Sequence, residues 1–183
     1  KAAGARVLEM PINTGVGGAL RAGFRYAVEH GYRRVVQVDA DLQHPPEAIP
    51  TLLEPLDAGA ELVIGSRFAD GYEVGFPRRL AMRILAGIVR LRTGAVLDDV
   101  TSGFRGIAEP LLSRFAYRFP ADYLGDTVEA ILIAHAAGAS IRQVPVPMAP
   151  RRAGEATPPL RAGAHLARLF VALVAGKPTE MAR

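Results

Sequence analysis

The order of apolar and polar positions predicts strands alternating with helices over the first 65 residues. Short apolar runs rich in β-branched side chains are typical of buried strands, and longer runs with apolar residues three or four positions apart are typical of helices. The strands are expected at 6–9, 34–38 and 61–65, and the helices at 16–30 and 47–56. This alternation predicts an α/β fold with a mostly parallel sheet, whose strands share one carboxyl edge.

The same kind of pattern continues in the second half of the chain. Further helices are expected at 77–92, 124–137 and 160–175, a short strand or turn at 101–107, and a further strand at 140–147. Residues 1–4 read as the end of a helix that leads directly into the first strand, so we expect an element to precede them.

Composition narrows the class of protein without choosing a function. Half of the 183 residues are apolar, which is enough for one substantial core. The chain has no cysteine, which excludes disulfides and thiolate zinc sites and favours a cytoplasmic setting. The net charge of +4 favours partners that carry phosphate. Nucleic acid is not an expected partner, because the arginines are not interleaved with aromatic residues.

An acidic run directly follows the strand expected at 34–38. Asp39, Asp41 and Gln43 offer hard oxygen ligands in a tight turn, which suits Mg²⁺ or Mn²⁺ held together with a diphosphate. The alternative is that the two aspartates only cap the loop ahead of the next helix. The sequence therefore predicts a metal site at this edge of the sheet and leaves the capping alternative open.

A glycine-rich turn leads into the helix expected at 16–30. Asn13, Gly15 and Gly17 lie where backbone N–H groups and a helix N-terminus could meet a donor phosphate. The glycines could equally serve a tight turn and close packing of the helix on the sheet.

Five runs of this sequence, in this order, resemble family 2 glycosyltransferases, and most of all their dolichol-phosphate mannose synthase-like branch. The runs occupy residues 13–19, 38–47, 65–68, 101–105 and 123–129. The resemblance implies a GT-A-like fold and inverting, metal-assisted transfer of a hexose from a nucleotide-diphosphate sugar to a polyprenyl phosphate. It also implies that residues 1–150 form a catalytic domain lacking its first strand–helix–strand portion, followed by a loop and an amphipathic helix in residues 151–183.

The resemblance also implies roles for individual residues. Asp39, Asp41 and Gln43 correspond to the residues that contact the metal and the donor diphosphate. Arg67 and Arg79 correspond to arginines that hold the acceptor phosphate. Arg79 shares a helix face with Arg83 and Arg90, and a solvated basic face is the alternative explanation for that row. Arg105 is expected either to contact the acceptor phosphate or to form an ion pair.

The acceptor decides whether a protein base is needed. A phosphomonoester is largely dianionic at neutral pH and can attack the anomeric carbon unaided, whereas a sugar hydroxyl needs a base. Asp126 is the candidate base, and with Asp41 and Arg67 it completes the predicted catalytic set. Asp122, Asp126 and Glu129 share one helix face, so they could instead stabilise the N-terminus of that helix.

The helix expected at 160–175 is amphipathic and too short to span a bilayer. It could lie in a membrane interface or pack on the domain edge. We expect an enzyme that contacts the cytoplasmic face of a membrane peripherally. A family 2 transferase that acts on a hydroxyl and a non-catalytic membrane-surface module are the alternatives.

Overall fold

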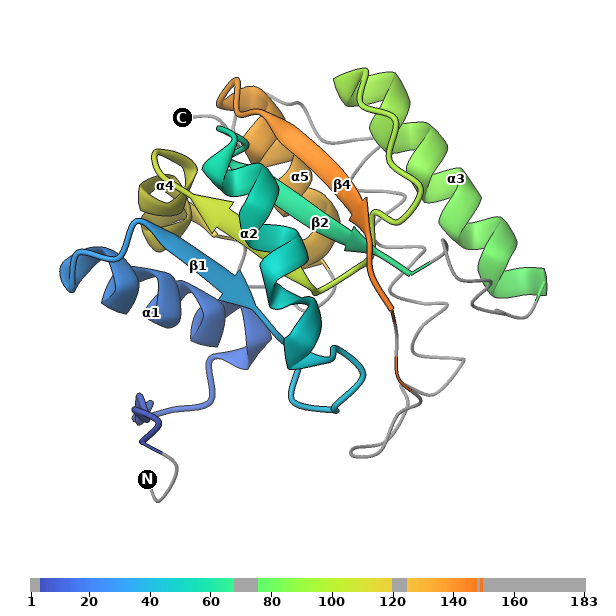
Figure 1. The fold of residues 1–183 in the computed structure, drawn as a ribbon. Helices are drawn as coiled ribbons and strands as arrows, with labels where there is room; N and C mark the ends of the chain where they lie inside the picture. The colour runs from blue at the N-terminus through green and yellow to red at the C-terminus, as the bar shows by residue number, and fades with distance from the viewer. Residues whose placement is uncertain (1–3, 68–75, 120–124, 148, 150–183) are drawn as a thin grey trace.

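The computed structural model describes residues 4–67, 76–119, 125–147 and 149, which form a four-stranded sheet with helices on both faces (Figure 1). The strands are β1 (Arg34–Gln37), β2 (Leu62–Ser66), β3 (Arg105–Ala108) and β4 (Ile141–Pro145). The α-helices are α1 (Gly15–Glu29), α2 (Ile49–Asp57), α3 (Phe76–Thr93), α4 (Leu111–Arg118) and α5 (Gly125–Ala136). A 3₁₀ turn at Pro46–Ala48 leads into α2.

The sheet of these residues is mixed in its pairing, although three of its strands run in one direction. β3 lies between β1 and β2 and pairs antiparallel with both, whereas β2 and β4 pair in parallel. The carboxyl ends of β1, β2 and β4 therefore lie at one edge of the sheet. Because β3 runs the opposite way, the turn that enters β3 lies at that same edge.

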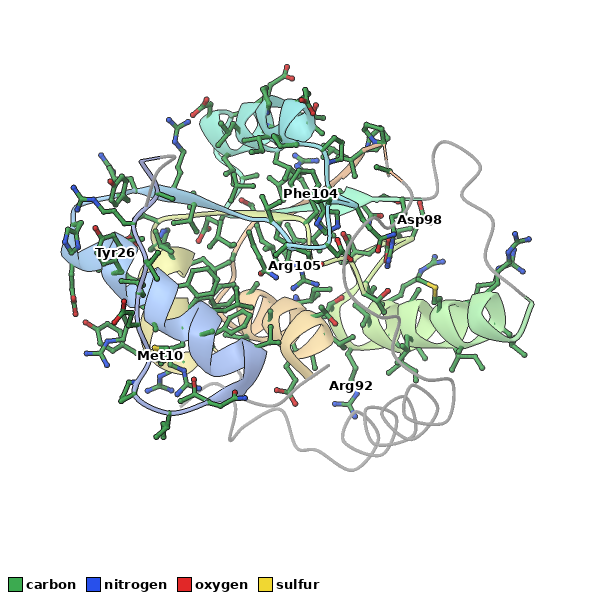
Figure 2. All side chains as sticks on the ribbon, turned by 90° about the horizontal axis from the view of Figure 1, so that it is seen from below. Met10, Tyr26, Arg92, Asp98, Phe104 and Arg105 are labelled. Atoms are coloured by element: carbon green, nitrogen blue, oxygen red, sulfur yellow. The ribbon has the colours of Figure 1, made fainter. Side chains whose placement is uncertain are left out.

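Each face of the sheet is covered by its own helices. Alternate side chains of a strand point to opposite faces, so Leu62 and Ile64 of β2 join one core and Val63 joins the other. α2 covers the smaller core around Val63, whereas α1, α4 and α5 cover the larger one, with α3 packed against α5. Figure 2 shows α2 above the sheet and the other helices below it.

The strand expected at 6–9 does not form. Val7 and Leu8 are 58% and 44% exposed, in a segment without regular structure. In the described part of the chain, β1 is paired only with β3 and its other edge has no strand beside it. A short strand needs a hydrogen-bonded neighbour. Without one, residues 6–9 do not form a strand in spite of their β propensity.

The other predicted elements correspond to observed ones, with ends that differ by a few residues. α4 has no counterpart among the predictions, because its eight residues are too few to show a clear helical period. The helix expected at 160–175, and with it the proposed division at residue 150, lies outside the described residues.

Candidate active site

The acidic run forms an exposed turn at the carboxyl end of β1. The Asp39 side chain is 50% exposed, and Asp41 Oδ1 accepts a hydrogen bond from the backbone N–H of Gln43 at 3.0 Å. Leu42, between Asp41 and Gln43, has a φ of +63°, a left-handed conformation that is uncommon for a residue with a side chain. Such strain persists only where the surroundings impose it, and it often marks a functional turn.

A buried histidine holds the base of this turn. His44 is 5% exposed and stacks on Phe104, with ring centroids 4.8 Å apart and planes 12° from parallel. Its Nδ1 accepts a hydrogen bond from the backbone N–H of Asp39 at 3.3 Å. Burial lowers the pKa of His44 in spite of the nearby Asp39 and Asp41 carboxylates. A neutral imidazole is the form that can accept at Nδ1, so the lowered pKa and the hydrogen bond agree.

The turn that enters β3 touches the acidic turn directly. A Cβ atom placed on Gly103 would lie 2.8 Å from Asp39 Oδ2 and 3.0 Å from Oδ1. The carboxylate of Asp39 therefore rests against the backbone of residue 103, at a distance that a larger residue would not permit. The run at 101–105 and the run at 38–47 meet at one edge of the sheet as a result.

Arg67, the first residue after β2, is held by a buried carboxylate. Arg67 Nε and Nη2 donate to Asp99 Oδ2 and Oδ1 at 2.6 and 2.9 Å, and Nη2 also donates to Thr101 Oγ1 at 2.8 Å. Asp99 is fully buried, and the Arg67 side chain is 12% exposed. Burial alone would raise the pKa of Asp99, but the hydrogen bonds and charge of Arg67, with a further bond from Thr101, outweigh it and lower the pKa.

Arg105 points into the protein interior. Its side chain is 2% exposed, Nε donates to the carbonyl oxygen of Ser102 at 2.7 Å, and Nη2 donates to that of Val100 at 3.4 Å. Figure 2 shows Phe104 and Arg105 between the helical layers. This placement does not match the predicted contact with an acceptor phosphate, because burial keeps the guanidinium from the surface. Arg105 instead shapes the turn at 100–102.

The glycine-rich turn has local structural reasons for its composition. Asn13 Oδ1 accepts a hydrogen bond from the backbone N–H of Gly15 at 2.9 Å, and Gly15 has a φ of +72°. A Cβ on Gly18 would lie 2.5 Å from the Thr14 side chain. Gly17 is buried. Figure 1 shows the N-terminal end of α1 at the same end of the molecule as the carboxyl end of β1.

α3 carries the predicted row of arginines beside an exposed apolar row. Arg79, Arg83 and Arg90 are exposed, as are Leu80, Ile84 and Leu91, which lie one position further along the helix. Both rows have the spacing i, i+4 and i+11, so each forms a stripe along the helix. In the described ranges, no helix combines the length and apolar content needed to cross a bilayer.

Two predicted site residues are described only in part or not at all. Asp126 lies in the first turn of α5, but its side chain is outside the described part of the chain. Asp122 lies wholly outside the described part of the chain. The structure thus brings the acidic turn and Arg67 to one sheet edge and gives no position for the candidate base.

The oxygen ligands of the acidic turn fit a hard divalent cation that takes its remaining ligands from a substrate. Within the described residues, no group of three or more acidic, histidine or cysteine side chains could hold a metal by itself. Mg²⁺, however, is commonly bound by one or two carboxylates together with phosphate oxygens and water. Asp39 and Asp41 with the amide of Gln43 meet that pattern.

Several residues that build this site were not singled out from the sequence. Asp99, Thr101, His44, Gly103 and Gln143 each fix another residue of the site. Asp99 carries a carboxylate close to the run at 101–105, but its partner Arg67 lies 32 positions away in the sequence. Such a pairing depends on the order of strands in the sheet, which the sequence pattern alone did not give.

Comparison with curated proteins finds relatives that act on lipid phosphates. The chain is 36% identical to an undecaprenyl-phosphate mannosyltransferase of Micrococcus luteus, over 81% of this chain and 63% of the relative. It is 37% identical to a polyprenol monophosphomannose synthase of Mycolicibacterium smegmatis, over 59% of this chain and 42% of the relative. The chain thus spans less than two thirds of the length of these relatives.

Solved structures with a similar fold contain a nucleotide sugar or a nucleotide. The glucosyl-3-phosphoglycerate synthase of Mycobacterium tuberculosis, in complex with Mn²⁺, uridine-diphosphate-glucose and phosphoglyceric acid, matches with a TM-score of 0.68 and 26% identity. The match covers 95% of this chain and 61% of that one. The same enzyme with Mg²⁺ and uridine-diphosphate matches with a TM-score of 0.67. The predicted GT-A-like α/β fold is confirmed. Residues 1–115 match the profile of Glycosyl transferase family 2, and the chain belongs to that family.

Proposed function

We propose that the protein is an inverting, metal-assisted glycosyltransferase that moves a hexose from a nucleotide-diphosphate sugar to a polyprenyl phosphate. The observation that carries the proposal is the meeting of two unlike turns at one sheet edge. The open carboxylates of residues 39–43 suit a cation and a diphosphate, and the fixed guanidinium of Arg67 suits a phosphate. Gly103 links the two, since it contacts Asp39 and lies two residues from Thr101.

On the donor side, Asp39, Asp41 and Gln43 would hold the metal ion and orient the diphosphate. The ion supplies positive charge that neutralises the leaving diphosphate. Asn13, Gly15 and Gly17 complete the proposed donor side, because the N-terminal end of α1 directs backbone N–H groups toward this end of the molecule. The Mn²⁺ and Mg²⁺ ions of the solved neighbours support this assignment.

On the acceptor side, Arg67 and Arg79 would bind the lipid phosphate. A phosphate oxygen attacks the anomeric carbon, the bond from that carbon to the donor diphosphate breaks, and the nucleotide diphosphate leaves with the electron pair. Attack from the face opposite the leaving group inverts the anomeric centre. The phosphate dianion needs no protein base, so arginine charge and orientation supply the protein's share of the catalysis. The names of the curated relatives support a lipid-phosphate acceptor.

We also propose that α3 provides contact with a membrane surface. Leu80, Ile84 and Leu91 present an exposed apolar stripe beside an exposed arginine row, which matches the pattern of helices that lie in an interface. Acceptor lipids would then approach the site from the side of α3 on which Arg79 lies. The helix expected at 160–175 is a second proposed contact.

The decisive test of the activity uses the whole natural protein. Nucleotide sugars are screened with a polyprenyl phosphate, with and without Mg²⁺ or Mn²⁺, and the sugar-phosphate lipid product is measured. We expect product only with a divalent metal, and a loss of about 100-fold on Arg67→Met. Absence of product with every donor, or full activity in EDTA, would contradict the proposal.

A second candidate is transfer to a hydroxyl group, favoured by the likeness to a solved enzyme in complex with phosphoglyceric acid. This reaction needs a base, for which Asp126 is the candidate. Asp126→Asn separates the two. Loss of turnover with unchanged donor binding supports a hydroxyl acceptor, and turnover within a few-fold of wild type supports a phosphate acceptor.

The proposed membrane contact is tested by co-sedimentation with anionic vesicles. Leu91 is 88% exposed, so Leu91→Gln removes apolar surface without opening a core cavity. We expect roughly fivefold weaker partitioning, which corresponds to about 1 kcal/mol, and an unchanged melting temperature. Tyr117→Gln on α4, also exposed, is the matched control and should partition like the wild type. Equal partitioning of all three proteins would remove α3 from the proposal.

A further inference from the structure

Asp99 is the only buried carboxylate among the residues that the structure describes. It lies in the connection between α3 and β3, outside the runs assigned to donor or acceptor. We propose that Asp99 is a positioning residue, which fixes the guanidinium of Arg67 in the orientation that receives the acceptor phosphate. The inference rests on the proposed function and deepens it, because it explains how the acceptor arginine is held.

The carboxylate of Asp99 is surrounded by donors from two residues. Oδ2 accepts from Arg67 Nε at 2.6 Å and from the Arg67 backbone N–H at 3.4 Å. Oδ1 accepts from Arg67 Nη2 at 2.9 Å, and from Thr101 Oγ1 and the Thr101 backbone N–H at 3.1 and 3.2 Å. Two oxygens on two nitrogens of one planar group fix both the position and the tilt of that plane.

The backbone around Asp99 is itself fixed to the sheet. Gln143 of β4 donates from Nε2 to the carbonyl oxygen of Asp99 at 3.2 Å and accepts from the backbone N–H of Asp98 at 2.7 Å. β4 pairs with β2, the strand that ends at Ser66, directly before Arg67. The carboxylate and the guanidinium are therefore held by neighbouring strands of one sheet, and Figure 2 shows Asp98 at the end of the sheet near α3.

The charge of Asp99 predicts different effects of its removal on the reaction and on phosphate binding. The pair of Arg67 and Asp99 is neutral as a whole, so Asp99 does not increase the attraction of the site for phosphate. If its role is positioning, removing its charge should impair the reaction while leaving phosphate binding as tight as before or tighter. A residue that only stabilised the fold would instead weaken every function of the protein together.

Asp99→Asn in the whole natural protein tests this prediction. The amide keeps the size of the carboxylate but places an NH₂ group against the Arg67 donors. We expect kcat for sugar transfer to polyprenyl phosphate to fall about 100-fold, a loss typical of misplaced groups. The Kd values for the lipid phosphate and the nucleotide sugar should not rise. Asp98→Asn is the matched control, because it removes an exposed acid next to Asp99, and it should retain wild-type kcat.

A double-mutant cycle asks whether Asp99 acts through Arg67. In an Arg67→Met background, Asp99→Asn should cause no further loss of kcat. Additive losses would overturn the inference, as would a kcat of Asp99→Asn within twofold of wild type, or a joint loss of donor binding and melting temperature. If Asp99→Asn does not fold, Thr101→Val removes one shared hydrogen bond and should lower kcat about fivefold, again only when Arg67 is present.

A measurement on the free protein separates this inference from the proposed function. Solvent exchange of the Arg67 Nε–H proton, followed by ¹⁵N NMR, should be slow in the wild type and in Asp98→Asn and fast in Asp99→Asn. Slow exchange in Asp99→Asn overturns the positioning role whatever the reaction is. If exchange behaves as expected but the wild type transfers no sugar to any lipid phosphate, the pairing stands and the acceptor role falls with the proposed function.

Discussion

The two halves of the candidate site are built in opposite ways. The acidic turn is open to solvent, with a half-exposed Asp39 and a strained residue at Leu42. The cluster of Arg67, Asp99 and Thr101 is closed, with a fully buried carboxylate and paired hydrogen bonds. Both lie at the same sheet edge, so position on the sheet does not account for the difference.

The difference follows from the ligands that each half is proposed to take. A hard cation keeps water and phosphate oxygens in its shell, so its carboxylates can remain solvated until the ligand arrives. An arginine that must orient a phosphate needs a fixed plane beforehand, and a buried partner supplies one. Loss of one member of a buried pair costs about 3–5 kcal/mol, so Arg67 cannot readily leave Asp99.

The largest expected effect tests the open half. Asp39→Asn should lower the rate of sugar transfer about 1,000-fold, because the proposed metal and diphosphate lose a charged ligand. The melting temperature should stay within about 1 °C of wild type, since surface substitutions cost little stability. Radiolabelled transfer assays and calorimetry measure the two quantities.

Glu47→Gln is the control for this experiment. It removes an exposed acid from the 3₁₀ turn behind the acidic run and should keep full activity. A folded Asp39→Asn protein with near-normal turnover would show that the open carboxylate has no part in the reaction.

Gly103→Ala tests the contact between the two halves. The added Cβ would lie 2.8 Å from Asp39 Oδ2, so the carboxylate must shift. We expect about a 100-fold loss of kcat/KM, because small displacements of reacting groups carry costs of this order. Gly23→Ala is the matched control, since that helical glycine has no atom within 4 Å of an added Cβ and should gain about 0.5–1 kcal/mol of stability. Equal activities of the Gly103→Ala and Gly23→Ala proteins would show that the contact between residue 103 and Asp39 does not affect the reaction.

Acid unfolding tests the closed half. The pKa of Asp99 is lowered in the folded protein, so its contribution to stability is complete above the unfolded pKa of about 3.9 and is lost as the pH falls toward the folded value. Urea midpoints at pH 6, 4 and 3 should therefore fall more steeply in wild type than in Asp99→Asn. Asp98→Asn should keep the wild-type slope, and identical slopes in all three proteins would mean that folding does not lower the pKa of Asp99.

The smallest effect concerns strain in the open half. Leu42→Gly places a residue that tolerates positive φ where the turn requires it, at a side chain that is 59% exposed. We expect a gain of about 1 kcal/mol in the free energy of unfolding, measured by urea titration. A loss of stability instead would show that contacts of the Leu42 side chain outweigh the backbone strain.

Local patterns predicted most of the fold, and the failures have physical causes. Runs of apolar residues located β1, β2 and α1, because burial of one face needs a regular spacing. The strand at 6–9 failed because strand formation depends on a neighbour and not on the segment alone. α4 was missed because two helical turns give too little periodicity.

The candidate site was predicted in the same uneven way. The acidic turn could be predicted as a candidate metal site because its proposed ligands lie within five consecutive residues. The partner of Arg67 was not, because Asp99 comes from a distant part of the chain. Arg105 was expected either to contact the acceptor phosphate or to form an ion pair, and the inward-facing position it occupies on β3 buries it.

The sequence by itself determined which short segments are proposed to carry chemistry, since the acidic run at 39–43 and the row of arginines on α3 follow from local order. Only the tertiary structure decided how those segments combine. The insertion of β3 between β1 and β2 brings Gly103 against Asp39 and Asp99 against Arg67. Strand order depends on the packing of two cores at once, and that is a property of the whole chain.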